Sequence, residues 1–393
     1  MNSKKVDRKK RVVLVTQEIS LAKILASNER GVRERGVRKL RKWLSARSRA
    51  GFPFKEDDMM RVWKGLFYSM WMADKPLVQE QVAENVSQLV HAVDDDVKFV
   101  SLFVSCFMRT MSREWHGIDH YRLDKFSMLV RRVVRQSLVF CLRAQWASHV
   151  VQQLGDVFSS TVLCGWPARS LSMHFCELFL VELGKVGAGR LPTHTTHAFL
   201  QPFVAYLARE KDALLRSHVV EHVFHHLVRQ SEFGQDYQAR FDAWKSAGFP
   251  GTSWEQMELV ELSGEEDEEE RQDAVCDPRA GSVHVELKPL LFEPAVVADQ
   301  LLQQRAATFD VHNRKTLKDL ADDFTKMSKG KYPLKLTNFG KMNKYIREVR
   351  NASRCKRHTL KVTKKLLQFE TRLMQQKGGV RKKSKQRKVK NGG

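Results

Sequence analysis

The clearest potential for chemistry lies in two histidines and a glutamate in the segment His218-Val-Val-Glu221-His222. This is the H-x-x-E-H spacing of inverted zinc peptidases, in which two histidines one helical turn apart bind zinc and the glutamate acts as general base. A metal-dependent hydrolase or nuclease is therefore one hypothesis. Five residues with two free positions recur often by chance, and the sequence offers no identifiable third ligand. We favour a structural role as the polar flank of a packed helix, and we predict no metal and no other cofactor.

Other catalytic signatures are missing from the sequence. There is no G-x-x-x-x-G-K-[ST] phosphate loop, no G-x-G-x-x-G dinucleotide motif and no G-x-S-x-G nucleophile elbow. The six cysteines are scattered without a C-x-x-C pair, which is typical of reduced thiols used for packing. The sequence therefore argues against nucleotide-dependent enzymes and serine hydrolases, and we predict that the chain is not an enzyme.

Positive charge is concentrated at the two ends of the sequence. The formal net charge is +23, and residues 331–393 contribute +19 of it, from 21 Lys or Arg against Glu348 and Glu370. Residues 1–11 contribute +5, so that residues 12–330 sum to −1. Basic blocks of this kind are typical of proteins that bind a polyanion. No apolar stretch approaches the roughly 18 residues of a membrane-spanning helix, so we expect nucleic acid and not a membrane as the partner.

The basic C-terminal region divides into two parts. Residues 343–376 combine a thin apolar stripe with basic residues and predict a basic helix, whereas the run from Gly378 has no capacity to form a core and is expected to be disordered until bound. A nuclear-import tag would explain only the basic clusters at residues 382–385 and 387–390. Direct contact with RNA phosphates better explains the basic residues that precede them. The predicted RNA-binding residues are Arg347, Arg350, Arg354, Arg357, Lys361, Lys364, Lys365, Arg381, Lys382, Lys383, Lys385, Arg387 and Lys388.

The elements that must position these groups are predicted to be helices. Apolar residues recur at i, i+3, i+4, i+7, i+8, i+11 and i+12 from Met59 to Trp71, after an acidic pair that suits a helix N-terminus. Lys75-Pro76 places a proline at a predicted first helical position. The aromatic spacing of Trp63, Phe67 and Trp71 could offer a base-stacking platform, but it is more typical of a helix core.

Successive helices with short connections, and no strand alternation, predict an all-α fold. We expect a HEAT-like helical-repeat solenoid followed by the basic C-terminal arm. The predicted organisation is a basic segment (1–20), a helical-repeat domain (21–230), a linker (231–293), a short helical unit that completes the domain (294–330), and a basic helix with a disordered tail (331–393). The linker contains the acidic run EEDEEE at residues 265–270, which is either a solvated loop or an RNA mimic.

Two blocks of sequence are more specific than their composition. They are WKGLFYSMWMADKPLVQEQ at residues 63–81 and REWHGIDHYRLDKFSMLVRRV at residues 113–133. Both resemble the signature blocks of the nucleolar ribosomal RNA-processing protein 1 family, whose domain is also called Nop52. The resemblance implies a helical-repeat protein of the nucleolus that associates with early precursors of the large ribosomal subunit. It also implies a role in removing internal transcribed spacer RNA, without nuclease activity.

The charged residues of these blocks have two possible roles. Positively and negatively charged side chains occur near a glycine-containing junction between helices. Ion pairs there could fix the angle between the helices. Alternatively, the same residues could contact a partner protein. We favour the structural role, because RNA phosphates would select one sign of charge. The predicted docking or structural residues are Trp63, Lys64, Trp71, Asp74, Lys75, Pro76, Glu114, Trp115, Asp119, Arg122, Asp124 and Lys125.

The favoured function is a non-catalytic factor of the nucleus and nucleolus that scaffolds precursors of the large subunit. Its expected partners are precursor ribosomal RNA, the pre-60S particle and other large-subunit assembly factors, with no membrane and no small-molecule substrate. The alternatives are a nuclear adaptor that binds protein only and, with less support, a metal-dependent hydrolase that uses His218, Glu221 and His222.

Overall fold

The computed structural model describes residues 16–164, 168–246 and 288–334, without the side chains of residues 242–246. Every regular element in these ranges is helical, as the sequence predicted. The described helices all belong to one compact unit, which ends at Pro333. No helix among the described residues is long and apolar enough to cross a membrane.

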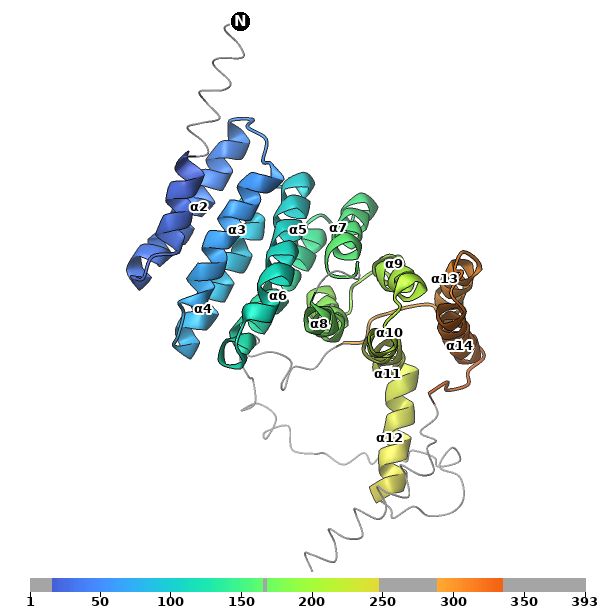
Figure 1. Cartoon of the computed structure of the whole chain (residues 1–393). Helices are drawn as coiled ribbons and strands as arrows, with labels where there is room; N and C mark the ends of the chain where they lie inside the picture. The colour runs from blue at the N-terminus through green and yellow to red at the C-terminus, as the bar shows by residue number, and fades with distance from the viewer. Residues whose placement is uncertain (1–15, 165–167, 247–287, 335–393) are drawn as a thin grey trace, which may run out of the picture. The chain divides into compact units, whose positions relative to one another are not determined.

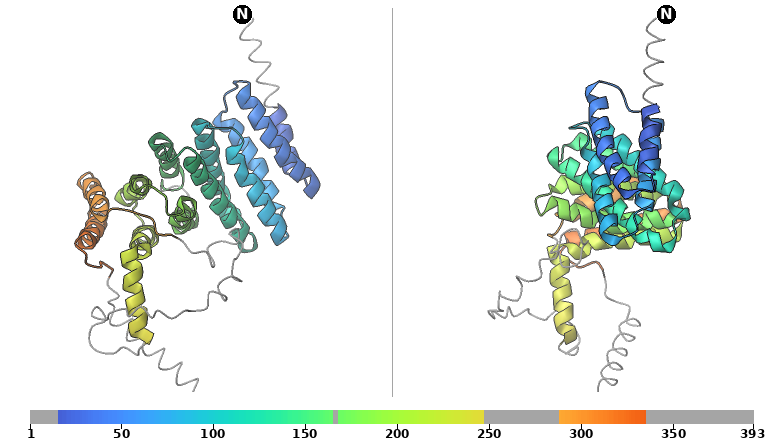
Figure 2. Two further views of the ribbon diagram at one scale, coloured as in Figure 1. Left: turned by 180° about the vertical axis from the view of Figure 1, so that it is seen from behind. Right: turned by 90° about the vertical axis from the view of Figure 1, so that its left-hand side faces the viewer.

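The helices follow one another in chain order, as Figure 1 and the left view of Figure 2 show. After a helical segment at residues 16–25, the helices are α2 (Arg30–Arg49), α3 (Glu56–Trp71), α4 (Pro76–Ser87), α5 (Val97–Glu114), α6 (His120–Arg143), α7 (Ser148–Thr161), α8 (Arg169–Gly187) and α9 (Thr193–Arg209). Then come α10 (Ala213–Val219), a π-helical turn (Val220–His225), α11 (His226–Gln230), α12 (Glu232–Ser246), α13 (Pro294–Ala306) and α14 (Val311–Ser328).

From α2 to α10, each helix packs on the helix two places along the chain, which is the arrangement of a two-layered solenoid. One layer consists of α3, α5, α7 and α9, and the other of α2, α4, α6, α8 and α10. Helices α13 and α14 pair with each other and both contact α9. This confirms the predicted all-α helical-repeat fold. Helix α12 lies within the range assigned from sequence to the linker, and the predicted helix at residues 343–376 lies outside the described residues.

Buried aromatic side chains join helices both within a layer and between the two layers. Trp63 of α3 contacts Phe103 and Phe107 of α5, with ring centroids 4.6 and 4.7 Å apart. A second cluster joins Phe158 of α7, Phe175 and Phe179 of α8, and Phe199 and Phe203 of α9. Large side chains of this kind bury about 150–250 Å² each. The apolar periodicity in the sequence therefore corresponds to the faces between consecutive helices.

Candidate functional site

The tryptophans of the first signature block are structural. Trp63 is 1% exposed, and its indole N–H donates a hydrogen bond of 2.8 Å to the backbone carbonyl of Phe103. One turn further along α3, Phe67 stacks on Phe126 of α6 with 4.7 Å between centroids. Trp71, at the end of α3, is half-buried. Of the three predicted core residues, Trp63 and Phe67 are therefore buried and Trp71 is partly exposed. The neighbouring Tyr68 is 40% exposed.

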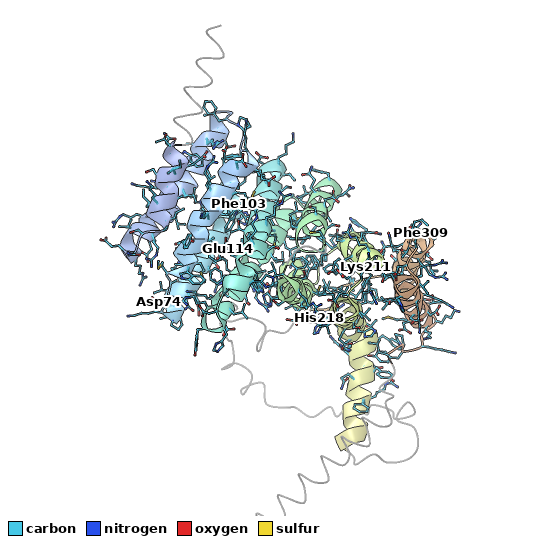
Figure 3. All side chains as sticks on the ribbon, in the orientation of Figure 1. Asp74, Phe103, Glu114, Lys211, His218 and Phe309 are labelled. Carbon is cyan, nitrogen blue, oxygen red and sulfur yellow. The ribbon has the colours of Figure 1, made fainter. Side chains whose placement is uncertain are left out.

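The turn from α3 to α4 is closed by short-range polar contacts. Pro76 is the first residue of α4, as predicted, and it occupies a position where a missing backbone N–H has no cost. The side-chain amide of Gln79 donates to the carbonyls of Ala73 and Asp74 at 3.2 and 3.0 Å. Asp74, Lys75 and Pro76 themselves are exposed (Figure 3 labels Asp74).

Lys125 connects α6 to the C-terminal end of α3. Its ammonium group donates to the backbone carbonyls of Trp71 and Ala73 at 2.6 and 2.8 Å, and the residue is 3% exposed. The guanidinium of Arg33, also buried, donates to the carbonyl of Met72 at 3.1 Å. The last carbonyls of a helix lack partners within the helix and carry the negative end of its dipole. Two cations from α2 and α6 therefore satisfy the end of α3.

Burial changes the acid–base behaviour of Lys125. Removal from water, reinforced by the nearby charge of Arg122, lowers the pKa of Lys125 to about 8. The ammonium group is still mainly protonated at neutral pH, as its two carbonyl acceptors require. The expected role of these charged residues was to form ion pairs at the junction between consecutive helices. Lys125 instead donates to backbone carbonyls at and just beyond the end of α3, 54 and 52 residues away in the sequence.

The N-terminus of α6 carries the remaining charged residues of the second block. Asp119 is the N-cap, accepting from the backbone N–H of Arg122, and its carboxylate also pairs with the Arg122 guanidinium. The hydrogen bond from Arg122 lowers the pKa of Asp119. The Arg122 guanidinium also lies over the Trp71 ring, 4.7 Å from its centroid. Trp115 is buried and donates to the hydroxyl of Ser170 on α8 at 2.7 Å.

The block residues thus separate into internal and exposed groups. Trp63, Trp115 and Lys125 hold helices together, whereas Lys64, Glu114 and Asp124 are at least partly open to solvent (Figure 3 labels Glu114). Sequence reasoning missed two apolar side chains beside this junction. Leu77 near the start of α4 is 80% exposed, and Tyr121 near the start of α6 is 85% exposed. Helical periodicity could have placed both off the buried faces. Exposed large apolar side chains are candidates for partner contact.

The H-x-x-E-H segment brings only part of its pattern together. The rings of His218 and His222 lie 4.1 Å apart, but Glu221 pairs instead with His225 and Arg229, at 2.9 and 2.5 Å. The carboxylate that approaches the two histidines belongs to Glu177 of α8, and one atom from each of these three side chains falls within a 4.8 Å cluster. Sequence spacing could not reveal this third group.

The hydrogen bonds of His218 favour a structural role over a metal site. Its Nε2 atom lies 3.2 Å from the carbonyl of Met173 and 3.2 Å from the carboxylate of Glu177. A nitrogen that donates to a backbone carbonyl carries a proton and has no lone pair for a metal. The arrangement therefore joins α10 to α8, and the general base of the hydrolase hypothesis is not directed at the histidine pair.

All thirteen predicted RNA-binding residues, from Arg347 to Lys388, lie outside the described residues. Within the described residues, sequence reasoning missed a second concentration of positive charge, on α2. Acidic residues elsewhere in residues 12–330 offset this charge, so it does not appear in the net charge of that range.

Comparisons with known proteins agree on one family. Residues 16–321 match the family model described as "Nucleolar protein, Nop52". The chain is 38% identical over 334 residues to the ribosomal RNA processing protein 1 homolog of Drosophila melanogaster, covering 83% of this chain and 49% of that protein. It is 42% identical over 222 residues to homolog A of Homo sapiens, covering 56% and 48%, respectively. Human homolog B is 35% identical over 331 residues, covering 80% and 43%.

Proposed function

The chain belongs to the Nop52 family of nucleolar proteins, and on that premise we propose that it is a non-catalytic scaffold for precursors of the large ribosomal subunit. In this proposal the helical body docks assembly factors and structured RNA, and the basic arm binds precursor ribosomal RNA. The chain supports removal of internal transcribed spacer RNA by this means. The observation that carries the proposal is the family match over residues 16–321, because its relatives are named for ribosomal RNA processing.

The geometry of the body supports docking over catalysis. The charged residues of the signature blocks are either bonded within the protein, as Lys125 and Arg122 are, or open to solvent, as Glu114 and Asp124 are. Leu77 and Tyr121, near the starts of α4 and α6, expose most of their side chains. Exposed charged and large apolar side chains are the groups from which protein-binding surfaces are built. The chain spans about half the length of the curated relatives that it matches.

The role of the arm can be tested with charge variants of the full chain. Replacing the thirteen predicted RNA-binding residues of the arm by glutamine should flatten the dependence of log affinity on log salt. On single-stranded RNA the slope should fall by about 0.7 for each phosphate that the arm no longer neutralises. A matched control keeps the composition of residues 343–393 but scrambles their order. It should bind RNA with nearly the wild-type slope, because phosphate contacts need charge and not sequence. An unchanged slope in the glutamine variant would remove the arm from the proposal.

The biological role can be tested by replacement in cells. Cells depleted of the endogenous protein should accumulate large-subunit precursors that retain internal transcribed spacer RNA, and the wild-type chain should reverse this. The variant with the thirteen glutamine replacements, called the arm variant below, should sediment apart from pre-ribosomal particles. Normal precursor processing after depletion would contradict the proposed function.

A further inference from the structure

Helix α2 has a large excess of basic over acidic residues. Among its 20 residues are nine Lys or Arg, and Glu34 is the only acidic residue. Its first turn contains no acidic residue, although the N-terminal end of a helix favours negative charge. Good helix formation alone therefore does not account for this composition.

The cations of α2 have two different environments. Arg33 and Arg47 are buried and are used inside the protein, Arg33 on backbone carbonyls and Arg47 on the carboxylates of Glu18 and Asp58. Successive residues of an α-helix are rotated by about 100° about its axis. By this geometry a second group of cations falls within an arc of roughly 100°, on the side of α2 opposite the buried residues Val37, Leu40 and Leu44. The members of this group, which we call the α2 basic face, are Arg35, Arg38, Lys39, Lys42 and Arg49, and all are exposed.

Within residues 16–164, 168–246 and 288–334, no carboxylate pairs with any residue of the α2 basic face. The exposed ion pair on this helix joins Arg30 to Glu34, which lies at the edge of the face. Arg35 with Arg38, Arg35 with Lys39, and Arg38 with Lys42 are like-charged neighbours at i,i+3 or i,i+4, and such pairs each destabilise a helix by roughly 0.2–0.5 kcal/mol. The face thus carries repulsion that an external anion would relieve.

Helix α14 shows what an ordinary solvated face looks like in the same protein. Its exposed cations Arg314, Lys315 and Lys318 share the helix with Asp319, Asp322 and Asp323. Mixed signs of this kind solvate a helix without attracting a polyanion. The α2 basic face, which carries charge of one sign only, therefore differs from the exposed face of α14.

We propose that the α2 basic face is a phosphate-binding surface for RNA, located on the folded body and separate from the C-terminal arm. A row of cations that spans about 21 Å from Arg35 to Arg49, at about 1.5 Å per residue, presents regularly spaced charge to a sugar–phosphate backbone. Each neutralised phosphate releases counterions, so several such contacts add without any base recognition. The choice of RNA over another polyanion rests on the proposed function. With this face, the body and the arm would hold RNA at two places.

The test compares two triple variants of the full chain. Arg35→Gln, Arg38→Gln and Lys42→Gln remove three charges from the α2 basic face, and glutamine keeps a helix propensity close to that of arginine and lysine. The matched control, Arg314→Gln, Lys315→Gln and Lys318→Gln, removes the same charge from α14. Affinity for an unstructured single-stranded RNA oligonucleotide is measured by fluorescence anisotropy over a range of salt concentrations, with a thermal melt to verify folding.

The salt slope of the α2 variant should decrease by about 0.7 for each of the three charges, or about 2 in total, whereas the α14 control should bind like wild type. Equal slopes for the two variants would overturn the proposal. It would also be overturned if the α2 variant bound polyglutamate more weakly but RNA as before, which would assign the face to an acidic protein. Failure of the α2 variant alone would leave the proposed function standing, because the arm variant tests that function independently.

Discussion

Helices α6 and α2 use positive charge in opposite ways. On α6, Lys125 bonds to backbone carbonyls, Arg132 pairs with Glu84, and Arg131 and Arg135 pair with Glu182 of α8. On α2, the outward-facing cations of the basic face have no carboxylate partner among the described residues. The formal net charge of residues 12–330 is close to zero. This range nevertheless includes internal charges that hold helices together and exposed charges that are available to a partner. Net charge alone could not distinguish these two uses.

The largest expected effect comes from breaking the internal charge network at Glu182. Burial alone would raise the pKa of this carboxyl group, but the hydrogen bond from Arg135 and the charges of Arg135, Lys185 and Arg131 lower it overall. Glu182→Gln leaves these cations without an anion and should reduce the free energy of unfolding by about 3 kcal/mol, as measured by urea denaturation. Glu114→Gln, at an exposed position at the end of α5, is the control and should change stability little. Similar values for both variants would contradict an internal structural role for Glu182.

A smaller loss is expected from Lys125→Met. The carbonyl of Trp71 would lose the ammonium donor and that of Ala73 would keep only the Gln79 amide, which should cost about 1–3 kcal/mol of unfolding free energy. Lys64→Met, at an exposed position of α3, should stay within about 0.5 kcal/mol of wild type. A fully stable Lys125→Met protein would show that this contact does not join α6 to α3.

Two buried histidines should also make the stability of the protein depend on pH. Burial lowers the pKa of His91, on the short helical turn after α4, and of His174 on α8, below the ordinary value of 6.5. The unfolded chain therefore binds more protons than the folded one as the pH falls through about 6.5, and stability should decrease over that range. Urea midpoints at about pH 7.5 and about pH 5.5 measure the effect, and a His91→Gln, His174→Gln variant should show a weaker dependence. An unchanged dependence in that variant would assign the effect to other groups.

The smallest effect on stability is expected for the triple glutamine variant of α2. Removing like-charged neighbours should leave the free energy of unfolding unchanged or raise it by up to about 1 kcal/mol, in contrast to Glu182→Gln and Lys125→Met. Thermal and urea unfolding of the same preparation used for RNA binding provide the measurement. A clear loss of stability would show that the α2 basic face serves the fold.

Much of the fold was predictable from the sequence, because the apolar periodicity of a helix is local information. The helix ending at Trp71, the helix starting at Pro76 and the buried positions of Trp63 and Phe67 all follow from spacing and from helix-start chemistry. Contacts between distant residues were not predictable. Lys125 meets carbonyls more than 50 residues away, and Glu177 approaches His218 from a different helix.

The candidate site divides in the same way. The sequence indicated which residues belong to the signature blocks, but only the structure separates those that pack inside, such as Trp115, from those that remain exposed, such as Glu114. It likewise separates Arg33 from Arg35, which lie two residues apart on α2 but face the interior and the solvent, respectively. Direction on a helix decides whether a charge stabilises the fold or is available for binding.

The most direct test of the proposed function is crosslinking of the full chain to RNA in living cells, followed by sequencing of the bound RNA. We expect reads concentrated on precursors of the large-subunit ribosomal RNA, and a lower yield from the arm variant and from the α2 variant than from the α14 control. Crosslinks absent from ribosomal RNA precursors would contradict the proposed function and would favour an adaptor that binds protein only.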